Sequence, residues 1–293
     1  MKPAAFDYER VDTVEAALAL LASDADTKLL AGGQSLVTLM NLRLSRPSIV
    51  VDINRLTGLE RVFDDRDAMV IGALVRHRTI ETDPAIAARV PLLAAAAKHI
   101  GHIGIRNRGT LGGALAHSDP AAEFPMAALT LGATVQIESA ARGVRSIPAE
   151  ELFVSYYTSS LETDEMITWI TVPSLRDNQG WAFVEYARQH GDYGLAGAGV
   201  LMTVDSAGSI AELRVAVLGA GDTPVLFTHL DPDIRGHRPG KLLWANVSRE
   251  WVRNLAPSTT DPEYTRGLTA SAIEEALNTA TERAGDSWNE DRK

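Results

Sequence analysis

Two glycine-rich turns decide the fold of this chain: Ala31-Gly32-Gly33-Gln34-Ser35-Leu36 and, further along, Thr110-Leu111-Gly112-Gly113-Ala114. Glycine has no Cβ, so a Gly-Gly step can bring backbone N–H groups close to a ligand where other residues would block the approach. Successive N–H groups supply the partial positive charge that a phosphate needs. The pair of turns therefore predicts a ligand such as a dinucleotide, held at its pyrophosphate. The alternative interpretation of each turn is a tight connection without a ligand.

The first turn lies in a sequence context that is typical of phosphate-binding folds. Residues 28–30 are predicted to form a strand that runs into the turn, and the apolar residues after Ser35 continue at helical spacing up to Leu42. Ser35 is placed to cap this helix, and Pro47 ends the helical pattern. The β-branched residues over 49–53 predict a second strand. Strand, glycine turn, helix and strand in this order favour a phosphate site.

The composition limits the class of protein. The chain has 293 residues, of which 45% are hydrophobic and 23% charged, as is ordinary for a globular protein of two or three domains. Its formal net charge of −10 disfavours binding to nucleic acid or to an anionic membrane. The absence of Cys removes disulfides, thiol catalysis, iron–sulfur ligation and Cys-type zinc sites. No segment has the apolar length of a membrane span and the first residues have no apolar core, so we expect a cytoplasmic protein.

Apolar and turn residues predict an α+β chain of three units, 1–56, 57–176 and 177–285, followed by a frayed tail, 286–293. The first unit contains an amphipathic helix that Thr13 caps. The expected elements of the second unit are strands over 69–73, 133–137 and 165–172, and helices that begin at Asp83-Pro84 and Pro91. The expected elements of the third unit are an antiparallel sheet with strands over 181–188, 197–204 and 213–218, a loop with Asp231-Pro232-Asp233, and helices that begin near Ser248 and Asp261.

Several other patterns resemble metal or catalytic motifs but have simpler interpretations. His99 and His102 lie across a helix end without an obvious third ligand. The sequence His117-Ser118-Asp119 indicates a turn, because a catalytic triad combines residues that are distant in sequence. The glycines at 197–199 and 219–221 lack the third glycine and the following helix of a dinucleotide fingerprint. We therefore expect no metal ligand and no catalytic side chain.

Two acidic residues, Asp119 and Glu123, follow the second glycine turn. Carboxylates are poor neighbours for a phosphate but good acceptors for ribose hydroxyl groups. Asp119 directly before Pro120 is equally typical of a helix cap. Ribose binding and helix capping both remain possible interpretations at this point.

The two turns and their surroundings together resemble a known family. The resemblance is carried by residues 31–36 with Leu42-Arg43 downstream, by Arg106-Asn107-Arg108-Gly109-Thr110-Leu111-Gly112-Gly113, and by Asp119-Pro120. These residues resemble the FAD-binding medium subunit of the molybdenum hydroxylases, the xanthine dehydrogenase and carbon monoxide dehydrogenase family, and the resemblance covers nearly the whole chain. It implies a two-subdomain FAD-binding fold of the vanillyl-alcohol-oxidase type over 1–56 and 57–176. A C-terminal flavoprotein domain with a small antiparallel sheet would follow over 177–285.

The resemblance also implies which residues bind FAD. Both glycine turns would hold the pyrophosphate through backbone N–H groups. Ile100 would pack on the isoalloxazine, and Tyr193 would cover it from the C-terminal domain. The acids at 119 and 123 match polar positions near the ribose and adenine, and Ile167 matches an apolar contact. The implied FAD-binding residues are Leu29, Leu30, Ala31, Gly32, Gly33, Gln34, Ser35, Leu36, Ile100, Thr110, Leu111, Gly112, Gly113, Ala114, Asp119, Glu123, Ile167 and Tyr193.

Two positions depart from the family pattern. The second turn ends in Asn in many relatives, so Ala114 should remove one side-chain hydrogen bond to FAD, and Glu123 stands where Asp is common. One net hydrogen bond is worth about 0.5–1.5 kcal/mol. We therefore expect FAD to be held less tightly than in those relatives but to be retained.

The resemblance implies an electron-transfer subunit of an oxidoreductase complex. A large partner would hold the molybdenum pterin cofactor that oxidises the substrate, and a small partner would hold 2Fe–2S clusters that pass electrons to FAD and then to an external acceptor. The partners would form a dimer of heterotrimers, and the absence of Cys here fits this division. Gln34, where we associate carbon monoxide enzymes with His, favours an N-heterocycle or an aldehyde as substrate. The alternatives are a carbon monoxide dehydrogenase medium subunit, a free-standing flavoprotein oxidoreductase, and a module that holds a nucleotide without redox turnover.

Overall fold

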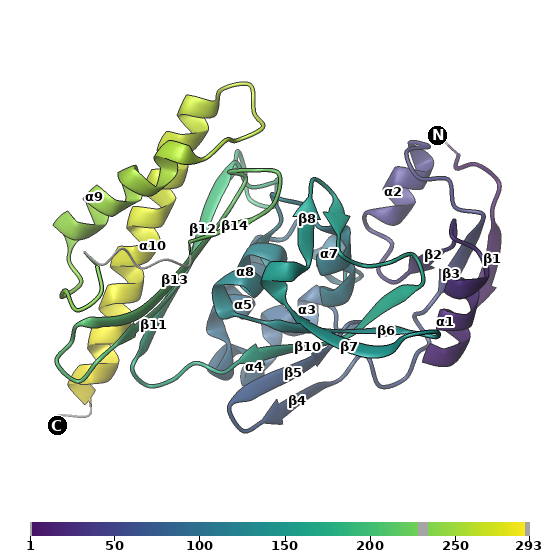
Figure 1. The fold of residues 1–293 in the computed structure, drawn as a ribbon, viewed down its shortest axis with the longest axis horizontal. Coiled ribbons are helices and arrows are strands. Elements are labelled where there is room, and N and C mark those ends of the chain that lie inside the picture. The colour runs from purple at the N-terminus through teal and green to yellow at the C-terminus, as the bar shows by residue number, and fades with distance from the viewer. Residues whose placement is uncertain (1, 228–233, 291–293) are drawn as a thin grey trace.

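Three sheet-based units follow one another along the chain (Figure 1). The computed structural model describes residues 2–227 and 234–290, with side chains up to residue 285. The N-terminal unit and the two long C-terminal helices lie at opposite ends of the molecule, and the second unit lies between them. Within these described residues, no helix is both long and apolar enough to cross a membrane.

The first unit is a parallel sheet with two helices. Its elements are β1 (Asp7–Arg10), α1 (Val14–Ser23), β2 (Lys28–Leu30), α2 (Leu36–Asn41) and β3 (Ile49–Asp52), with strand order β1-β3-β2. The predicted cap of α1 is confirmed, because Thr13 Oγ1 accepts a hydrogen bond from the N–H of Ala16 at 3.2 Å. The predicted cap of α2 is wrong, because Ser35 already has a helical backbone conformation and its side chain makes no capping hydrogen bond.

The second unit is an antiparallel sheet covered by helices. Its strands are β4 (Val62–Asp65), β5 (Ala68–Gly72), β6 (Thr134–Ser139), β7 (Gly143–Pro148) and β10 (Glu165–Pro173), in the order β4-β5-β10-β6-β7, with a separate hairpin of β8 (Phe153–Ser155) and β9 (Thr158–Ser159). Its helices are α3 (His77–Thr82), α4 (Pro84–Arg89), α5 (Pro91–His99), α6 (Ile103–Arg106), α7 (Leu111–His117), α8 (Glu123–Leu131) and a 3-10 turn η1 (Ala149–Glu151).

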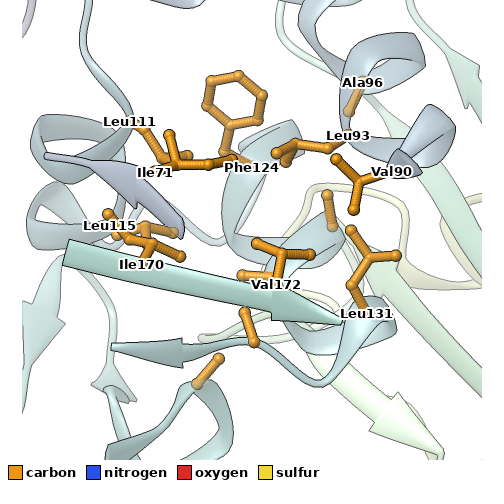
Figure 2. Packing of buried hydrophobic residues seen from close by; sticks show 14 of the residues in the cluster. Ile71, Val90, Leu93, Ala96, Leu111, Leu115, Phe124, Leu131, Ile170 and Val172 are labelled. Carbon is orange, nitrogen blue, oxygen red and sulfur yellow. The ribbon is translucent and has the colours of Figure 1, made fainter. Parts of the chain in front are cut away.

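The helices of the second unit pack on one face of its sheet through a continuous apolar core (Figure 2). Ile71 of β5, Phe124 of α8 and Ile170 of β10 are each at most 1% exposed. Removing apolar side chains of this kind from water stabilises a fold by about 1.5–3 kcal/mol each. This core fixes the start of α7, where the second glycine turn lies, against the end of β5.

The third unit is an antiparallel sheet with two long helices on one face (Figure 1). Its elements are β11 (Gln179–Tyr186), β12 (Ala196–Val204), β13 (Ile210–Leu218), β14 (Val225–Phe227), α9 (Lys241–Trp251), a 3-10 turn η2 (Val252–Asn254) and α10 (Pro262–Glu290). The helix expected near Ser248 begins earlier, at Lys241. The expectation of a frayed end from residue 286 is not met up to Glu290, which α10 includes. The expected loop at Asp231-Pro232-Asp233 lies outside the described residues.

Candidate functional site

A cavity of about 540 Å³ lies where the three units meet. This volume is in the range of small-molecule sites. Of the residues that the sequence assigned to the site, those that line the cavity are Leu29, Ala31, Gly32, Gly33, Gln34, Ser35, Leu36, Ile100, Thr110, Gly112, Gly113, Ala114, Asp119, Glu123, Ile167 and Tyr193. The other two lie behind its wall. The carbonyl of Leu30 accepts a hydrogen bond from the N–H of Ile53 at 3.1 Å, and Leu111 is 1% exposed in the core of the second unit (Figure 2).

The first glycine turn presents backbone N–H groups that the protein itself does not use. In the described part of the chain, the N–H groups of residues 32–36 donate to no protein acceptor. Gly33 has a φ of 73°, a left-handed conformation that glycine adopts without strain. A row of backbone donors on a cavity wall is suited to an anion, because each buried N–H needs an acceptor. This turn therefore offers backbone donors suited to an anion, without a basic side chain.

The second glycine turn has a different hydrogen-bond pattern. The N–H of Leu111 donates to Val75 O at 3.0 Å, and the N–H of Gly112 donates to Ala73 O at 2.9 Å. Thr110 caps helix α7, and its Oγ1 accepts from the N–H of Gly113 at 3.2 Å. The N–H of the last residue of the turn, at position 114, donates to Thr110 O. Among the described residues, the N–H groups of 111–114 are therefore used within the protein, and only the first turn offers the row of free N–H groups that the pyrophosphate hypothesis requires.

Close packing within the protein explains two of the glycines. A Cβ at Gly32 would lie 2.4 Å from Arg108 O and 2.8 Å from Gly109 Cα, so the two turns touch each other through their backbones. A Cβ at Gly112 would lie 2.5 Å from Ala73 Cβ, where the turn rests on the end of β5. Real Cβ atoms essentially never approach so closely, and both positions therefore require glycine for contact between segments of the chain.

A polar clamp holds the two turns together. Asn54 Nδ2 donates to the carbonyls of Leu30 and Ala31, at 3.2 and 2.9 Å, and so fixes the start of the first turn. Arg76 Nη2 donates to Asn54 Oδ1 at 2.7 Å, and Arg76 Nη1 donates to the carbonyl of Arg108, which precedes the second turn. The sequence analysis missed both clamp residues, because neither lies in a turn and only the folded chain brings them together.

The far end of the cavity is closed by contact between the second and third units. Ile100 and Gly101 follow α5, and Arg106 Nη1 holds their carbonyls at 3.2 and 2.7 Å. A Cβ at Gly191 would lie 2.9 Å from Gly101 O, so the loop before Tyr193 rests directly on this turn. The ring of Tyr193 is 71% exposed beside the cavity. This position suits a residue that covers a bound ligand.

One wall of the cavity is acidic. Asp119 Oδ2 accepts from the Tyr157 hydroxyl at 3.2 Å, and its Oδ1 accepts from the N–H of Ala121 at 2.9 Å. Helix α8 begins four residues later, at Glu123, so the helix-cap interpretation of Asp119 is wrong and a local turn takes its place. Burial, together with the nearby carboxylates of Glu185 and Asp119, raises the pKa of Glu123 to about 8. A protonated carboxyl here can donate a hydrogen bond as well as accept one.

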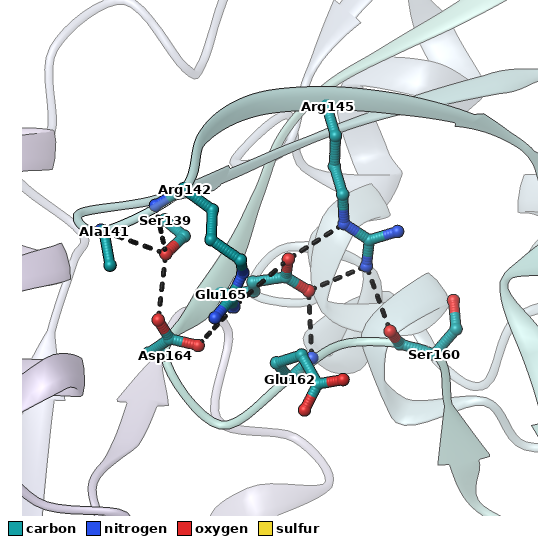
Figure 3. Close-up of polar contacts among 8 residues, drawn as sticks. All are labelled: Ser139, Ala141, Arg142, Arg145, Ser160, Glu162, Asp164 and Glu165. Carbon is teal, nitrogen blue, oxygen red and sulfur yellow. Dashed lines mark hydrogen bonds and ion pairs between the residues drawn. The ribbon is translucent and has the colours of Figure 1, made fainter.

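A salt-bridge network anchors the strand that carries Ile167 (Figure 3). The carboxylate of Glu165, whose side chain is 2% exposed, accepts from Arg145 Nε and Nη2 at 2.8 and 2.7 Å, and from the N–H of Glu162 at 2.9 Å. Burial alone would raise the pKa of Glu165, but these hydrogen bonds outweigh it and hold the pKa below its ordinary value. The network fixes the first residues of β10, next to the cavity wall.

Several cavity residues carried no signal in the sequence. His77, at the start of α3, is 6% exposed, and its Nε2 lies 3.0 Å from Thr110 O. Burial lowers its pKa to about 4, so the ring is neutral at physiological pH. Tyr157, in the β8–β9 hairpin, lines the cavity with a φ of 52°, which is rare for an aromatic residue. The motif-like histidines have other partners: His117 packs on Tyr157, and His99 faces Glu185.

Comparison with protein families matches nearly the whole chain. Residues 4–175 match the family described as "FAD binding domain in molybdopterin dehydrogenase", and residues 181–280 match "CO dehydrogenase flavoprotein C-terminal domain". The nicotine 6-hydroxylase medium subunit of Paenarthrobacter nicotinovorans is 48% identical over 75% of this chain and 76% of its own length. The caffeine dehydrogenase subunit beta of Pseudomonas sp. (strain CBB1) is 37% identical over 97% of both chains.

A solved structure shares the fold throughout. Carbon monoxide dehydrogenase from Hydrogenophaga pseudoflava superimposes with a TM-score of 0.92 at 32% sequence identity, and the match covers 97% of this chain and 99% of the other. Both family matches, these relatives and the paired glycine turns around one cavity indicate the same family. The α+β fold expected from the sequence is therefore confirmed, and this chain belongs to the family of FAD-binding medium subunits of molybdenum hydroxylases, as the oxidoreductase FAD subunit of a multi-subunit dehydrogenase.

Proposed function

We propose that this chain binds FAD in the cavity between its two glycine turns and passes electrons from partner subunits through that FAD to an external acceptor. One observation carries the proposal: residues 32–36 line the cavity with backbone N–H groups that lack any acceptor among the described residues. A pyrophosphate supplies oxygen acceptors for such donors, and no basic side chain is needed. The donor set therefore fits the group that the family name specifies.

The remaining wall residues fit the other parts of FAD. Asp119 supplies a carboxyl group for ribose hydroxyls on the acidic wall, where Glu123 also lies, while Ile100 and Ile167 supply apolar contacts. Tyr193 is placed to cover the ligand from the third unit. When bound, FAD supplies the redox chemistry, and the side chains of this chain bind it, orient it and limit its access to water.

We further propose the partners that the family resemblance implied. A large subunit would hold the molybdenum pterin cofactor, a small subunit would hold 2Fe–2S clusters, and the complex would be a cytoplasmic dimer of heterotrimers. The absence of Cys supports this division, because iron–sulfur clusters need thiolate ligands. The nicotine and caffeine relatives act, by name, on N-heterocycles and are 48% and 37% identical, against 32% for the carbon monoxide structure. These identities favour an N-heterocycle as the substrate of the complex.

Flavin content is the first test of this proposal. The full chain, purified with the subunits that co-purify with it, should show the visible absorbance of oxidised flavin and should release FAD on acid denaturation. Addition of pyridine or purine substrates without oxygen should bleach that absorbance, while carbon monoxide should not. A preparation without flavin that cannot be reconstituted with FAD would contradict the proposal. Bleaching by carbon monoxide alone would overturn the proposed substrate class and leave FAD binding intact.

A further inference from the structure

A row of titratable side chains leads from the cavity to the protein surface. Glu123 of α8 lines the cavity, and Glu185 of β11 lies close enough to raise the pKa of Glu123. His99, at the end of α5, faces Glu185, and His190, in the loop after β11, lies beside His99. These four residues come from four segments and converge at the junction of the second and third units. We call them the carboxyl–histidine row.

Glu185 is the buried centre of this row. Its side chain is 2% exposed, and its Oε2 has no hydrogen-bond partner among the described residues. Its Oε1 lies 3.8 Å from Nδ1 of His99, slightly beyond hydrogen-bond distance. Such distances often shorten when a ligand binds. A buried carboxyl without a full set of partners costs stability, so its presence calls for a function.

The two carboxyls are suited to exchange a proton near neutral pH. Burial raises the pKa of Glu185 to about 7, and burial together with Glu185 and Asp119 raises the pKa of Glu123 to about 8. Two buried carboxyl groups that interact do not both ionise readily, and they titrate as a pair. At neutral pH the pair therefore holds a proton that it can pass on.

The histidines connect this pair to solvent. The ring centroids of His99 and His190 are 6.2 Å apart, so the route places water between the two rings, and His190 is exposed. Burial lowers the pKa of His99, and the neighbouring His190 and Lys98 lower it further. A neutral imidazole accepts a proton on one nitrogen and donates from the other, as a relay requires.

We propose that the carboxyl–histidine row carries protons between the FAD cavity and solvent, in the order Glu123, Glu185, His99 and His190. The route rests on the proposed function, because it serves the protons of flavin redox chemistry. FAD that takes up two electrons from partner clusters also takes up two protons to give FADH₂, or one to give FADH⁻. Oxidation by an electron acceptor releases the same protons. Glu123, the first member of the row, lines the cavity itself, so the row starts at its wall.

Proton release can be timed against flavin oxidation. The full FAD-loaded complex is reduced photochemically without oxygen and mixed with ferricenium ion, which takes one electron and no proton. Each FADH₂ that reduces two ferricenium ions then releases two protons, and each FADH⁻ releases one. A pH indicator in weakly buffered solution follows the protons, while visible absorbance follows the flavin. The variants are Glu185→Gln, His99→Ala and the surface change His190→Gln, with His237→Gln as a control at an exposed histidine of the third unit.

The route predicts a specific set of results. Glu185→Gln and His99→Ala should slow proton release by roughly a hundredfold, the size typical of a lost proton-transfer group, and His190→Gln should slow it less. Added imidazole should restore the rate of His99→Ala but not of Glu185→Gln, and the control should match the wild type. Wild-type rates in all three variants would overturn the route, as would a slow His99→Ala that imidazole does not restore. A wild-type preparation without flavin would instead contradict the proposed function.

Discussion

Gly32→Ala is the sharpest test of how the two glycine turns form one site. The new Cβ would lie 2.4 Å from Arg108 O, about 1 Å closer than the 3.4 Å at which ordinary contact begins. It would also meet the backbone at Gly109 Cα, 2.8 Å away. Both obstacles are main-chain atoms that no side-chain rotation can move. The overlap can be relieved only if the two turns move apart.

The expected cost follows from this geometry. Inserting a carbon into a well-packed contact typically costs about 1–3 kcal/mol. The Arg76 and Asn54 clamp resists separation of the turns, because its hydrogen bonds tie Arg108 O to the start of the first turn. If the strain is relieved when the turns separate, the same energy is lost from FAD binding, roughly 5- to 150-fold in Kd. To the extent that the turns stay together without FAD, the strain instead destabilises the FAD-free chain and lowers its melting temperature by several degrees.

FAD titration and thermal unfolding of the FAD-free chain measure the two effects. Gly240→Ala is a matched control, because a Cβ there meets nothing within 4 Å and the backbone is extended. The control should leave the Kd near its wild-type value, and its melting temperature should change only by the loss of a glycine N-cap of α9. A Gly32→Ala chain that binds FAD and melts like the control would refute direct packing of the two turns.

Three further changes test the cavity wall. Ala114→Asn should tighten FAD binding about two- to tenfold by adding one side-chain hydrogen bond, measured by titration. The pKa of Glu123 is about 8 in the folded chain and near 4.5 when unfolded, so stability falls as pH rises between these values. Glu123→Gln should therefore raise the melting temperature of the FAD-free chain at pH 8 but not at pH 4.5. Arg145→Ala should cost about 1–3 kcal/mol, because Glu165 stays buried and keeps only Arg142, at 3.4 Å, as a cation. The pKa of Glu165 is below its ordinary value, so its stabilisation is lost as pH falls through that pKa, and the variant should show a flatter acid limb in denaturant titrations.

Local patterns determined how much of the fold could be predicted. The two strands that flank the first turn and its helix are short, β2 mostly apolar and β3 β-branched, and Thr13 and Asp83 stand at true helix starts, so these elements were found. Strands β4 and β7 are mostly exposed at the sheet edges and show no alternation between apolar and polar residues. The start of α9 was placed too late, because Pro239-Gly240 indicates a turn while the helix begins directly after it.

The site residues likewise divide into those that local sequence predicts and those that it misses. Turn residues such as Gly33 and Gln34 can be predicted from the neighbouring sequence, because the backbone conformation and the direction of the N–H groups are local properties. Asn54, Arg76 and Glu185 gave no signal, because their partners lie far away in the sequence. Only the packing of three units on one another brings such side chains to their partners around one cavity.

The two turns are similar in sequence but differ in the hydrogen bonds of their backbone N–H groups. Among the described residues, the N–H groups of 32–36 in the first turn have no acceptor and suit an anion, whereas the N–H groups of 111–114 in the second turn donate to Ala73, Val75 and Thr110. If FAD binds as proposed, the second turn reaches it chiefly through side chains, and the family resemblance implied an Asn at position 114. With Ala114 there, the contact between the turns at Gly32 becomes the main contribution of the second turn to binding, because it fixes the first turn in place. Gly32→Ala should accordingly weaken FAD binding more than Ala114→Asn strengthens it.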